Sequence, residues 1–304
     1  MPERLNGHDW KSCVGFTVHR GFESLSLRAD RSRLRRFGLY NLRVASPLSK
    51  SQVEQLGKRL VASGEPAHAD LQLLHELLLS RSSALEVAID RVRDHLQLAP
   101  TSRIKNTGTI LEKLLRNGGS GLKSMQDLAG MRLVGTFDRE GQDEITRQVS
   151  DLFGGEARAP KVIDRRVAPM HGYAAVHVVV FPGDAPIEIQ IRTAWQHEWA
   201  ELFEKLADLV GRGIRYGEAP RRWWSAEEYE AMDPVDQGLA RATYDLYKPA
   251  VTIALEIAQR IDAAEAKEVA VAGNPRQDPV RQSVDLLLAE FREVIEGVEK
   301  LRGL

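Results

Sequence analysis

The first regular pattern along the chain is a helical spacing of apolar residues between positions 49 and 98. Apolar side chains three and four positions apart lie on one face of a helix, so we predict helices over this stretch. Pro100 follows it and lacks the backbone N–H that would continue a helix. The spaced apolar positions are Leu71, Leu74, Leu77, Leu78, Leu85, Ile89, Val92 and Leu96.

Short strands and helices alternate in the middle of the chain. Apolar runs and alternation predict strands over 102–106, 130–137, 161–167, 173–181 and 186–193. Helical spacing predicts helices over 107–116 and 143–153, and glycines follow each of them as helix-ending residues. The short segment PGDA joins the last two strands, so we expect these strands to pair as a hairpin.

From Ala194 onward the pattern is helical almost throughout. Its clearest feature is an apolar stripe that runs from Val284 to Leu301 at helical spacing. This stripe either docks on the body of the protein or pairs with another chain, and the sequence leaves both open. Residues 272–279 (AGNPRQDP) have the composition of a linker.

Helices, a small sheet with interleaved helices, and further helices follow one another along the chain. This order is typical of the α+β class, and we predict a mixed β-sheet of about five strands flanked by helices, with helical extensions at both ends. Three regions follow from it. They are an irregular, arginine-rich region over 1–48, a sheet-containing domain with N-terminal helices over 49–217, and a helical C-terminal extension over 218–304.

Composition narrows the class of protein. Apolar residues make up 43% of the chain, enough for a hydrophobic core, and a net charge of -1 leaves any phosphate or nucleic-acid site to local clusters. The arginines within 28–43 form such a cluster, either a nucleic-acid arm or a solvated face. Cys13 is the single cysteine, which excludes an internal disulfide. We find no signal peptide and no apolar run of about 20 residues, and expect a cytoplasmic protein without a membrane span.

Three polar side chains share one face of the predicted strand 186–193. Glu188, Gln190 and Arg192 alternate there with isoleucines, which we expect to face the core. Pairing as a hairpin would bring Tyr173 and His177 of the preceding strand onto the same surface. A tyrosine ring in that place can stack on a base or a sugar. The alternatives are a solvated sheet face and, for the tyrosine, packing in the core.

Basic residues cluster where a predicted strand leads into the helix 107–116. Arg103 and Lys105 alternate on one extended face, and Lys113 lies four positions after Thr109 on the helix. Free backbone N–H groups at a helix N-terminus add to such charges, so the cluster predicts a polyphosphate site. Exposed basic residues beside a loop are the alternative.

A carboxylate, Asp127, precedes the predicted strand 130–137, which itself contains Arg132. Carboxylates beside phosphate-binding cations typically hold Mg²⁺, which takes oxygen ligands and commonly one or two carboxylates. Asp127 and Glu188 would supply two, whereas a turn or a helix cap is the alternative role of Asp127. The sequence contains no Walker loop, Rossmann fingerprint, zinc-ligand spacing or nucleophile elbow.

Four segments, in this order, resemble the synthetase domain of the RelA/SpoT family, the alarmone synthetases. They are SRIKNTGTILEKL, DLAGMRLV, GYAAVHVVV and EIQIRTAWQHEWAEL, within about 102–217. The resemblance implies a mixed sheet flanked by helices and related to the nucleotidyltransferases. It also implies transfer of the β,γ-pyrophosphate of ATP to the ribose 3′-hydroxyl of GDP or GTP, which releases AMP and yields (p)ppGpp.

The resemblance also implies roles for the polar residues. Asp127 and Glu188 would be the catalytic and metal-binding carboxylates that hold Mg²⁺ (or Mn²⁺), and Glu188 would help to activate the 3′-hydroxyl. The residues implied for the ATP phosphates are Arg103, Lys105, Lys113 and Arg132. The residues implied for the guanine nucleotide are Tyr173, by stacking, and His177, Gln190 and Arg192.

The chain departs from the family pattern on the acceptor side. Ala174 and Ala175 follow Tyr173 where Arg and Ser are common, no lysine closely precedes the Gly-Tyr pair, and Glu204 with Lys205 replaces a His-Lys pair. Two other functions therefore stay open. They are pyrophosphorylation of the 3′ end of tRNA, as in toxin-like relatives, and guanine-nucleotide binding without catalysis. Small family members also imply a homo-oligomer formed through the C-terminal helices.

Overall fold

The computed structural model describes residues 48–267 and 279–301. The arginine-rich region predicted over 1–48 and the linker predicted over 272–279 lie outside the described residues, except for one residue at the border of each. Cys13 also lies outside them.

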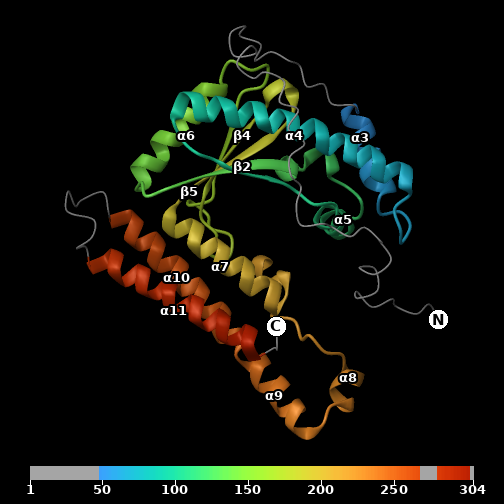
Figure 1. The fold of residues 1–304 in the computed structure, drawn as a ribbon, viewed down its shortest axis with the longest axis vertical. Helices are drawn as coiled ribbons and strands as arrows, with labels where there is room; N and C mark the ends of the chain where they lie inside the picture. Colours follow the sequence, from blue (N-terminus) through green and yellow to red (C-terminus); the bar gives the residue numbers. More distant parts are fainter. Residues whose placement is uncertain (1–47, 268–278, 302–304) are drawn as a thin grey trace, which may run out of the picture. The chain divides into compact units, whose positions relative to one another are not determined.

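A five-stranded mixed β-sheet forms the centre of the described chain (Figure 1). Its order is β1-β2-β5-β4-β3, in which β2 runs parallel to β5 and every other neighbouring pair is antiparallel. The prediction of a mixed sheet of about five strands is therefore confirmed. The strands are β1 (Thr101–Ile104), β2 (Ala129–Gly135), β3 (Lys161–Asp164), β4 (Val176–Val180) and β5 (Ile187–Thr193).

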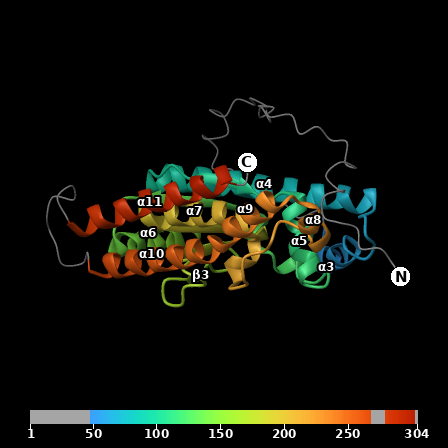
Figure 2. The ribbon, with the colours of Figure 1, turned by 90° about the horizontal axis from the view of Figure 1, so that it is seen from below.

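The helices confirm the α+β class and surround this sheet (Figures 1 and 2). They are α3 (Lys50–Arg59), α4 (His68–Leu96), α5 (Thr107–Arg116), α6 (Arg139–Phe153), α7 (Ala194–Val210), α8 (Ala226–Ala231), α9 (Pro234–Asp245), α10 (Tyr247–Lys267) and α11 (Pro279–Leu301). Four short 3-10 helices connect them, namely η1 (Leu122–Ser124), η2 (Gln126–Leu128), η3 (Pro182–Asp184) and η4 (Arg212–Tyr216). No helix within the described ranges is both long and apolar enough to cross a membrane.

One face of the sheet packs against α4 and α6 and forms a hydrophobic core. The isoleucines of β5, Ile187, Ile189 and Ile191, are fully buried in it, as the alternation predicted. Because side chains alternate along a strand, Glu188 and Gln190 emerge on the other face of the sheet. The two faces of β5 therefore separate the core from the polar surface.

β4 and β5 form the predicted hairpin, joined through η3. His177 of β4 lies directly opposite Gln190 of β5. The predicted strand 173–181 is too long at its start, because the Tyr173 N–H donates to the Met170 carbonyl at 3.0 Å in a turn. Gly172 makes this turn at a φ of +82°. Tyr173 therefore reaches the sheet surface from a turn and not from a strand.

Two predicted boundaries differ because polar side chains cap the elements. The predicted strand 161–167 ends at Asp164, whose carboxylate accepts the Arg166 backbone N–H at 2.8 Å and turns the chain away. The predicted helix 143–153 begins earlier, at Arg139, because the Asp138 carboxylate accepts the Gly141 N–H at 2.8 Å.

The apolar stripe of α11 packs inside the chain. Its residues are buried in one core with α7 and α10, and the two views show these three helices lying next to one another (Figures 1 and 2). Of the two alternatives left open by the sequence, the structure shows the first, in which the stripe docks on the body of the protein. The stripe is thus not the surface through which a homo-oligomer would form, and an oligomer through other faces of these helices stays a prediction. The buried stripe residues are Val284, Leu288, Phe291, Ile295 and Val298.

Candidate active site

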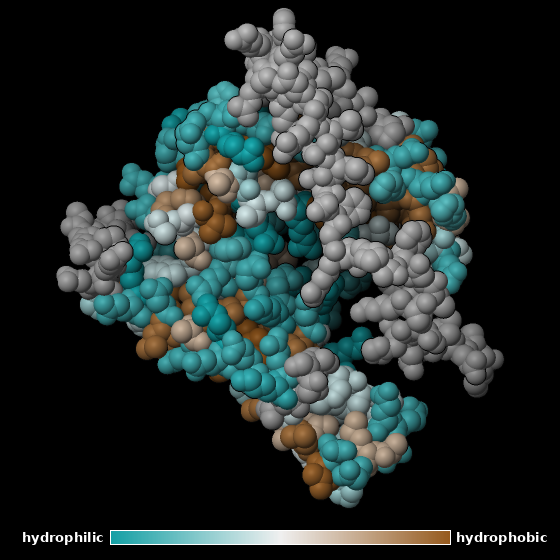
Figure 3. Space-filling model, viewed as in Figure 1, coloured by the Kyte–Doolittle hydropathy of each residue, from teal (hydrophilic) through white to brown (hydrophobic). Residues whose placement is uncertain are grey.

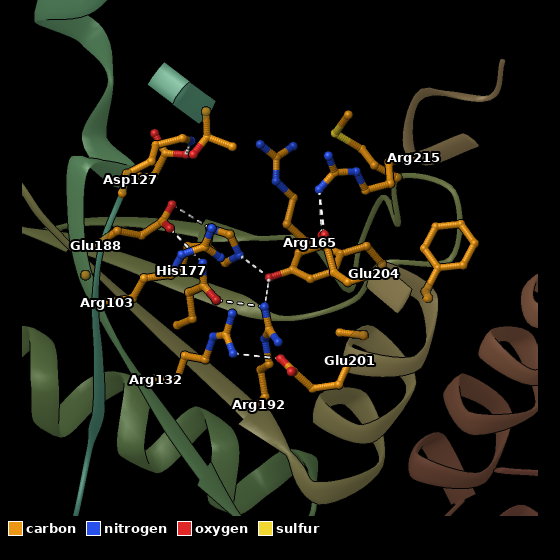
Figure 4. A pocket seen from close by; sticks show the side chains of 18 of the residues that line it. Arg103, Asp127, Arg132, Arg165, His177, Glu188, Arg192, Glu201, Glu204 and Arg215 are labelled. Carbon is orange, nitrogen blue, oxygen red and sulfur yellow. Dashed lines mark hydrogen bonds and ion pairs between the residues drawn. The ribbon is translucent and has the colours of Figure 1, made fainter. Parts of the chain in front are cut away.

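A pocket of about 380 Å³ lies on the polar face of the sheet, between β1 with α5 on one side and α7 with η4 on the other. Hydrophilic residues predominate where the sheet meets α7 in the space-filling view (Figure 3). All ten residues that we singled out as site residues line this one pocket (Figure 4). They are Arg103, Lys105, Lys113, Asp127, Arg132, Tyr173, His177, Glu188, Gln190 and Arg192.

A chain of hydrogen bonds connects Glu188 to Arg192 along the pocket wall. His177 contacts the Glu188 carboxylate through Nδ1 at 3.0 Å and the Tyr173 hydroxyl through Nε2 at 2.8 Å. Arg192 donates to the same hydroxyl at 2.9 Å. Gln190 links the ends, because it donates to Glu188 at 2.7 Å and accepts from Arg192 at 2.7 Å. Each polar group of the chain thereby holds its neighbour in place.

Burial and this network shift the pKa values of two of its members, Glu188 and Tyr173. Burial raises the pKa of Glu188, but the hydrogen bonds from His177 and Gln190 outweigh it, so that the pKa of this carboxyl lies below its usual value. Burial raises the pKa of Tyr173 despite the nearby charge of Arg192. At neutral pH the pocket therefore presents an ionised carboxylate at Glu188 and a protonated phenol at Tyr173.

The lowered pKa of Glu188 leads to a test of stability against pH. Glu188 stabilises the folded chain at pH values above its unfolded pKa of about 4.3, and this contribution is lost as the pH falls through the lower folded pKa. The melting temperatures of wild type and Glu188→Gln, measured by circular dichroism, should therefore converge as the pH is lowered from 7 toward 3. A difference that stays constant over this range would contradict the expectation.

A second polar group surrounds Asp127, just before β2. The Asp127 carboxylate accepts from the Lys105 ammonium at 2.5 Å and from that of Lys113 at 3.2 Å. Burial raises the pKa of Asp127, but the hydrogen bonds and charges of the two lysines prevail and lower it below the usual value. The Asp127 carboxyl is therefore ionised at neutral pH, where it accepts from the two lysines.

The N-terminus of α5 differs from the prediction of free backbone donors. The Asn106 side chain caps the helix and accepts from the Thr109 backbone N–H at 2.8 Å. The Thr109 backbone N–H, one of the donors expected to bind a phosphate, is therefore already bonded. Most of the positive potential beside α5 comes from the cationic side chains. The guanidinium of Arg103, on β1, has no ion-pair or hydrogen-bond partner among the described residues (Figure 4).

The structure adds residues that the sequence reasoning missed. Glu201 of α7 pairs with Arg132 at 2.7 Å, and Glu204, one turn further, accepts from the Arg215 guanidinium at 2.7 and 2.8 Å. The loop 211–218, which is rich in glycines and basic residues, also reaches the pocket through Arg215 and Tyr216. Glu201 and Glu204 are three positions apart and so lie on one face of α7. This spacing was the only sequence feature that could have indicated that both carboxylates reach the pocket.

Two carboxylates of the pocket are suited to a divalent cation. Asp127 and Glu188 both line it, and the charge of Asp127 acts on Glu188, whose pKa it raises slightly against the net effect. The part of the chain that the structure describes holds no cluster of three or more His, Cys, Asp or Glu side chains around one point. Mg²⁺ is commonly held by one or two carboxylates together with substrate phosphates, so this donor set fits it.

Comparison with known proteins places residues 102–207 in a family whose model is described as "Region found in RelA / SpoT proteins". Two mycobacterial proteins are each 35% identical to the chain over 188 residues, which are 60% of this chain and 68% of theirs. They are described as Uncharacterized protein Mb1401 of Mycobacterium bovis and Uncharacterized protein Rv1366 of Mycobacterium tuberculosis.

Among solved structures, the fold is similar to that of the small alarmone synthetase 1 from Bacillus subtilis. The identity is 21%, the match covers 64% of this chain and 95% of the other, and the TM-score is 0.41. A structure of the same Bacillus enzyme bound to its product pppGpp is 22% identical and covers 66% and 100% of the two chains, with a TM-score of 0.39. At these values the similarity says nothing about substrates.

Proposed function

Because the chain belongs to the RelA/SpoT family, we propose that its pocket transfers the β,γ-pyrophosphate of ATP to the ribose 3′-hydroxyl of GDP or GTP and so makes (p)ppGpp. The observation that carries the proposal is the position of Glu188. It lies between Asp127, with its two lysines, and His177, which contacts Tyr173 (Figure 4). A carboxylate thus separates a cationic subsite from an aromatic one.

The cationic subsite is suited to the triphosphate of ATP. Arg103, Lys105, Lys113 and Arg132 bring four cationic side chains to the pocket. Transfer of a phosphoryl or pyrophosphoryl group depends on position and on neutralised charge more than on a covalent intermediate. Asp127 now pairs with two of these cations, and Glu201 pairs with a third. Phosphate oxygens would take over these ammonium and guanidinium donors.

Asp127 and Glu188 would hold Mg²⁺ (or Mn²⁺), which when bound neutralises charge on the phosphates. The 3′-oxygen of the acceptor forms a bond to Pβ of ATP, the bond between Pβ and the α,β-bridging oxygen breaks, and AMP leaves. The proton of the 3′-hydroxyl passes to the Glu188 carboxylate, which is ionised and is oriented by His177 and Gln190. The carboxylate therefore orients and activates the nucleophile.

The aromatic subsite would take the guanine base. The Tyr173 hydroxyl is held by His177 and Arg192, and the Arg192 guanidinium lies 5.1 Å from the ring centroid. The orientation of the ring is thereby determined before any ligand binds. Gln190 and His177 offer hydrogen bonds on the same surface.

Tyr173→Ala is expected to raise the KM for GDP about 5- to 150-fold, because base stacking on an aromatic ring is worth about 1–3 kcal/mol. The KM for ATP should change much less. Tyr173→Phe is the matched control, since it keeps the ring and removes only the hydroxyl that contacts His177 and Arg192. Steady-state kinetics with each substrate varied would decide. An unchanged KM for GDP in Tyr173→Ala would exclude stacking.

AMP release tests the function itself. The protein is incubated with labelled Mg-ATP and, in separate reactions, with GDP, GTP or deacylated tRNA. AMP release and a labelled guanosine product with GDP or GTP would support the proposal. Release with tRNA alone would favour the tRNA alternative, whose arginine-rich segment 28–43 lies outside the described residues. Calorimetric binding of GDP with no AMP from any acceptor would favour the catalytically silent alternative.

A further inference from the structure

A buried carboxylate lies outside the pocket and outside the residues that match the family. Glu265, in the last turn of α10, is only 1% exposed, and no step of the proposed mechanism uses it. Burying a carboxylate is costly unless donors bond to its oxygens. The Thr193 hydroxyl donates to one oxygen at 2.5 Å, and the Gln196 side-chain amide donates to the other at 2.7 Å. Glu265 thus joins α10 to a distant segment of the chain.

The two donors lie at the corner where β5 leads into α7. Thr193 is the N-cap of α7, and the Gln196 backbone N–H donates to its hydroxyl at 3.1 Å. The Gln196 side-chain oxygen accepts the Thr193 backbone N–H in return at 3.3 Å, which completes a capping box. Arg192 directly precedes this corner and Glu201 follows it on α7, and both line the pocket. Glu265 therefore holds a segment from which pocket residues project on either side.

Further hydrogen bonds connect this corner, through α6, to the β3–β4 loop, residues 165–175. The Gln196 side-chain oxygen also accepts from the Gln142 side chain of α6 at 2.9 Å, and both glutamines are buried. The Gln142 oxygen accepts from the Arg166 guanidinium at 3.1 Å. Arg166 lies in the β3–β4 loop, which also carries Tyr173 of the pocket. Glu265, Gln196, Gln142 and Arg166 thus form one network, which connects α10 with the corner and the loop.

The two ends of the network fix the direction of each amide between them. A carboxylate can only accept and a guanidinium can only donate. Gln196 must therefore turn its N–H₂ group toward Glu265 and its oxygen toward Gln142. Gln142 must then turn its oxygen toward Arg166. Reversing either amide would bring two donors or two acceptors together, and a buried network with every member bonded is rigid. The orientation of the whole network therefore depends on the carboxylate of Glu265.

We propose that Glu265 is a positioning residue for the pocket, because its carboxylate fixes the β5–α7 corner and, through the two glutamines, the β3–β4 loop. The inference rests on the proposed function, in which Tyr173, held by Arg192, takes the acceptor base. Among the described residues, the cationic side chains of β1 and α5 make no hydrogen bond to the network. Loss of the Glu265 carboxylate should therefore weaken acceptor binding and leave ATP binding unchanged.

Glu265→Gln tests this role, because it keeps the shape of the side chain and places an amide N–H₂ group against the donor of Thr193 or of Gln196. The KM for GDP should rise about 2- to 30-fold, the range expected when a change acts on a site through a network, and the KM for ATP should stay within about twofold. A residue that only stabilised the fold would lower the amount of active protein, and so kcat, without changing either KM. An unchanged KM for GDP would overturn the proposal.

A reciprocal exchange keeps the test decisive if Glu265→Gln alone disturbs folding. In the double variant Glu265→Gln with Gln196→Glu, the amide at 265 donates to the carboxylate at 196, which still accepts from Gln142 and from the Thr193 backbone N–H. The amide oxygen at 265 still accepts from the Thr193 hydroxyl. Every donor is bonded again, so the KM for GDP should return to within about twofold of wild type. A double variant that fails to fold, or whose KM for GDP stays raised, would contradict the assigned role.

Glu256→Gln is the matched control. Glu256 is exposed on the same helix and does not line the pocket. Both KM values should equal those of wild type. If this variant raised the KM for GDP as Glu265→Gln does, the effect would belong to any change on α10, and the specific role of Glu265 would be lost.

Hydrogen exchange, measured by mass spectrometry on the full chain without nucleotide, separates this inference from the proposed function. In Glu265→Gln the backbone amides of 165–175 and 192–197 should exchange faster than in wild type, whereas those of 101–116, in β1 and α5, should be unchanged. If no acceptor supports AMP release, the proposed function fails, and the exchange rates still decide on Glu265. Unchanged exchange at the loop and the corner, or an equal rise over 101–116, would overturn the inference.

Discussion

Replacing Glu188 by glutamine is expected to lower the rate of AMP release about 10²- to 10⁴-fold, the range in which a positioned general base contributes. The glutamine side chain cannot take the proton of the 3′-hydroxyl and offers one acceptor oxygen in place of two. One of the donors that now contact the carboxylate, His177 Nδ1 or Gln190 Nε2, would then face an amide N–H₂. The loss therefore affects both charge and orientation.

The chain should still fold after this substitution, because glutamine has nearly the shape of glutamate and the isoleucines on the other face of β5 are unchanged. Single-turnover quench-flow with labelled ATP would measure the rate, and circular dichroism would verify the fold. Glu198→Gln is the matched control, since it makes the same change on α7 outside the pocket, where Glu198 pairs with Arg292. A wild-type rate in Glu188→Gln would remove Glu188 from the mechanism.

Asp127→Asn is expected to lower the rate about 100-fold or more, because it removes one of the two carboxylates proposed to hold the metal. The variant also leaves the Lys105 and Lys113 ammonium groups without the carboxylate that they now contact. Binding of ATP in the absence of metal should consequently be as tight as in wild type or tighter. Loss of metal affinity combined with retained binding of metal-free ATP would distinguish a ligand role from general damage.

Electron paramagnetic resonance of bound Mn²⁺ in the presence of ATP measures metal affinity without reference to turnover. Calorimetry with ATP and a chelator measures the binding of metal-free ATP. Asp208→Asn serves as control, because Asp208 is an exposed carboxylate that pairs with Arg212 and does not line the pocket. If Asp127→Asn bound Mn²⁺ with wild-type affinity, Asp127 would be a structural partner of the lysines and not a metal ligand.

The sequence by itself determined which side chains share a face. The alternation along 186–193 separates the isoleucines from Glu188, Gln190 and Arg192 in any sheet that buries one side, because successive side chains of a strand point in opposite directions. The short connection before this strand was enough to predict its hairpin. These features depend on a few neighbouring residues, and a local pattern is sufficient to specify them.

Tertiary structure alone decided which distant elements meet. The parallel pairing of β2 with β5 joins Gly130 to Glu188, and only this pairing brings the Asp127 end of β2 to the pocket. The docking of α7 adds Glu201 and Glu204, and two separate loops bring Arg165 and Arg215 to the pocket.

For the C-terminal apolar stripe, too, the sequence predicted the local feature and only the tertiary structure showed its partner. Its spacing predicted a buried helix face, but its partner, the core with α7 and α10, could not be read from the spacing. The apolar face of an amphipathic helix must be buried against another apolar surface, but its spacing does not identify that surface. Long-range contacts depend on the shape and the burial of the whole chain, and no local pattern encodes them.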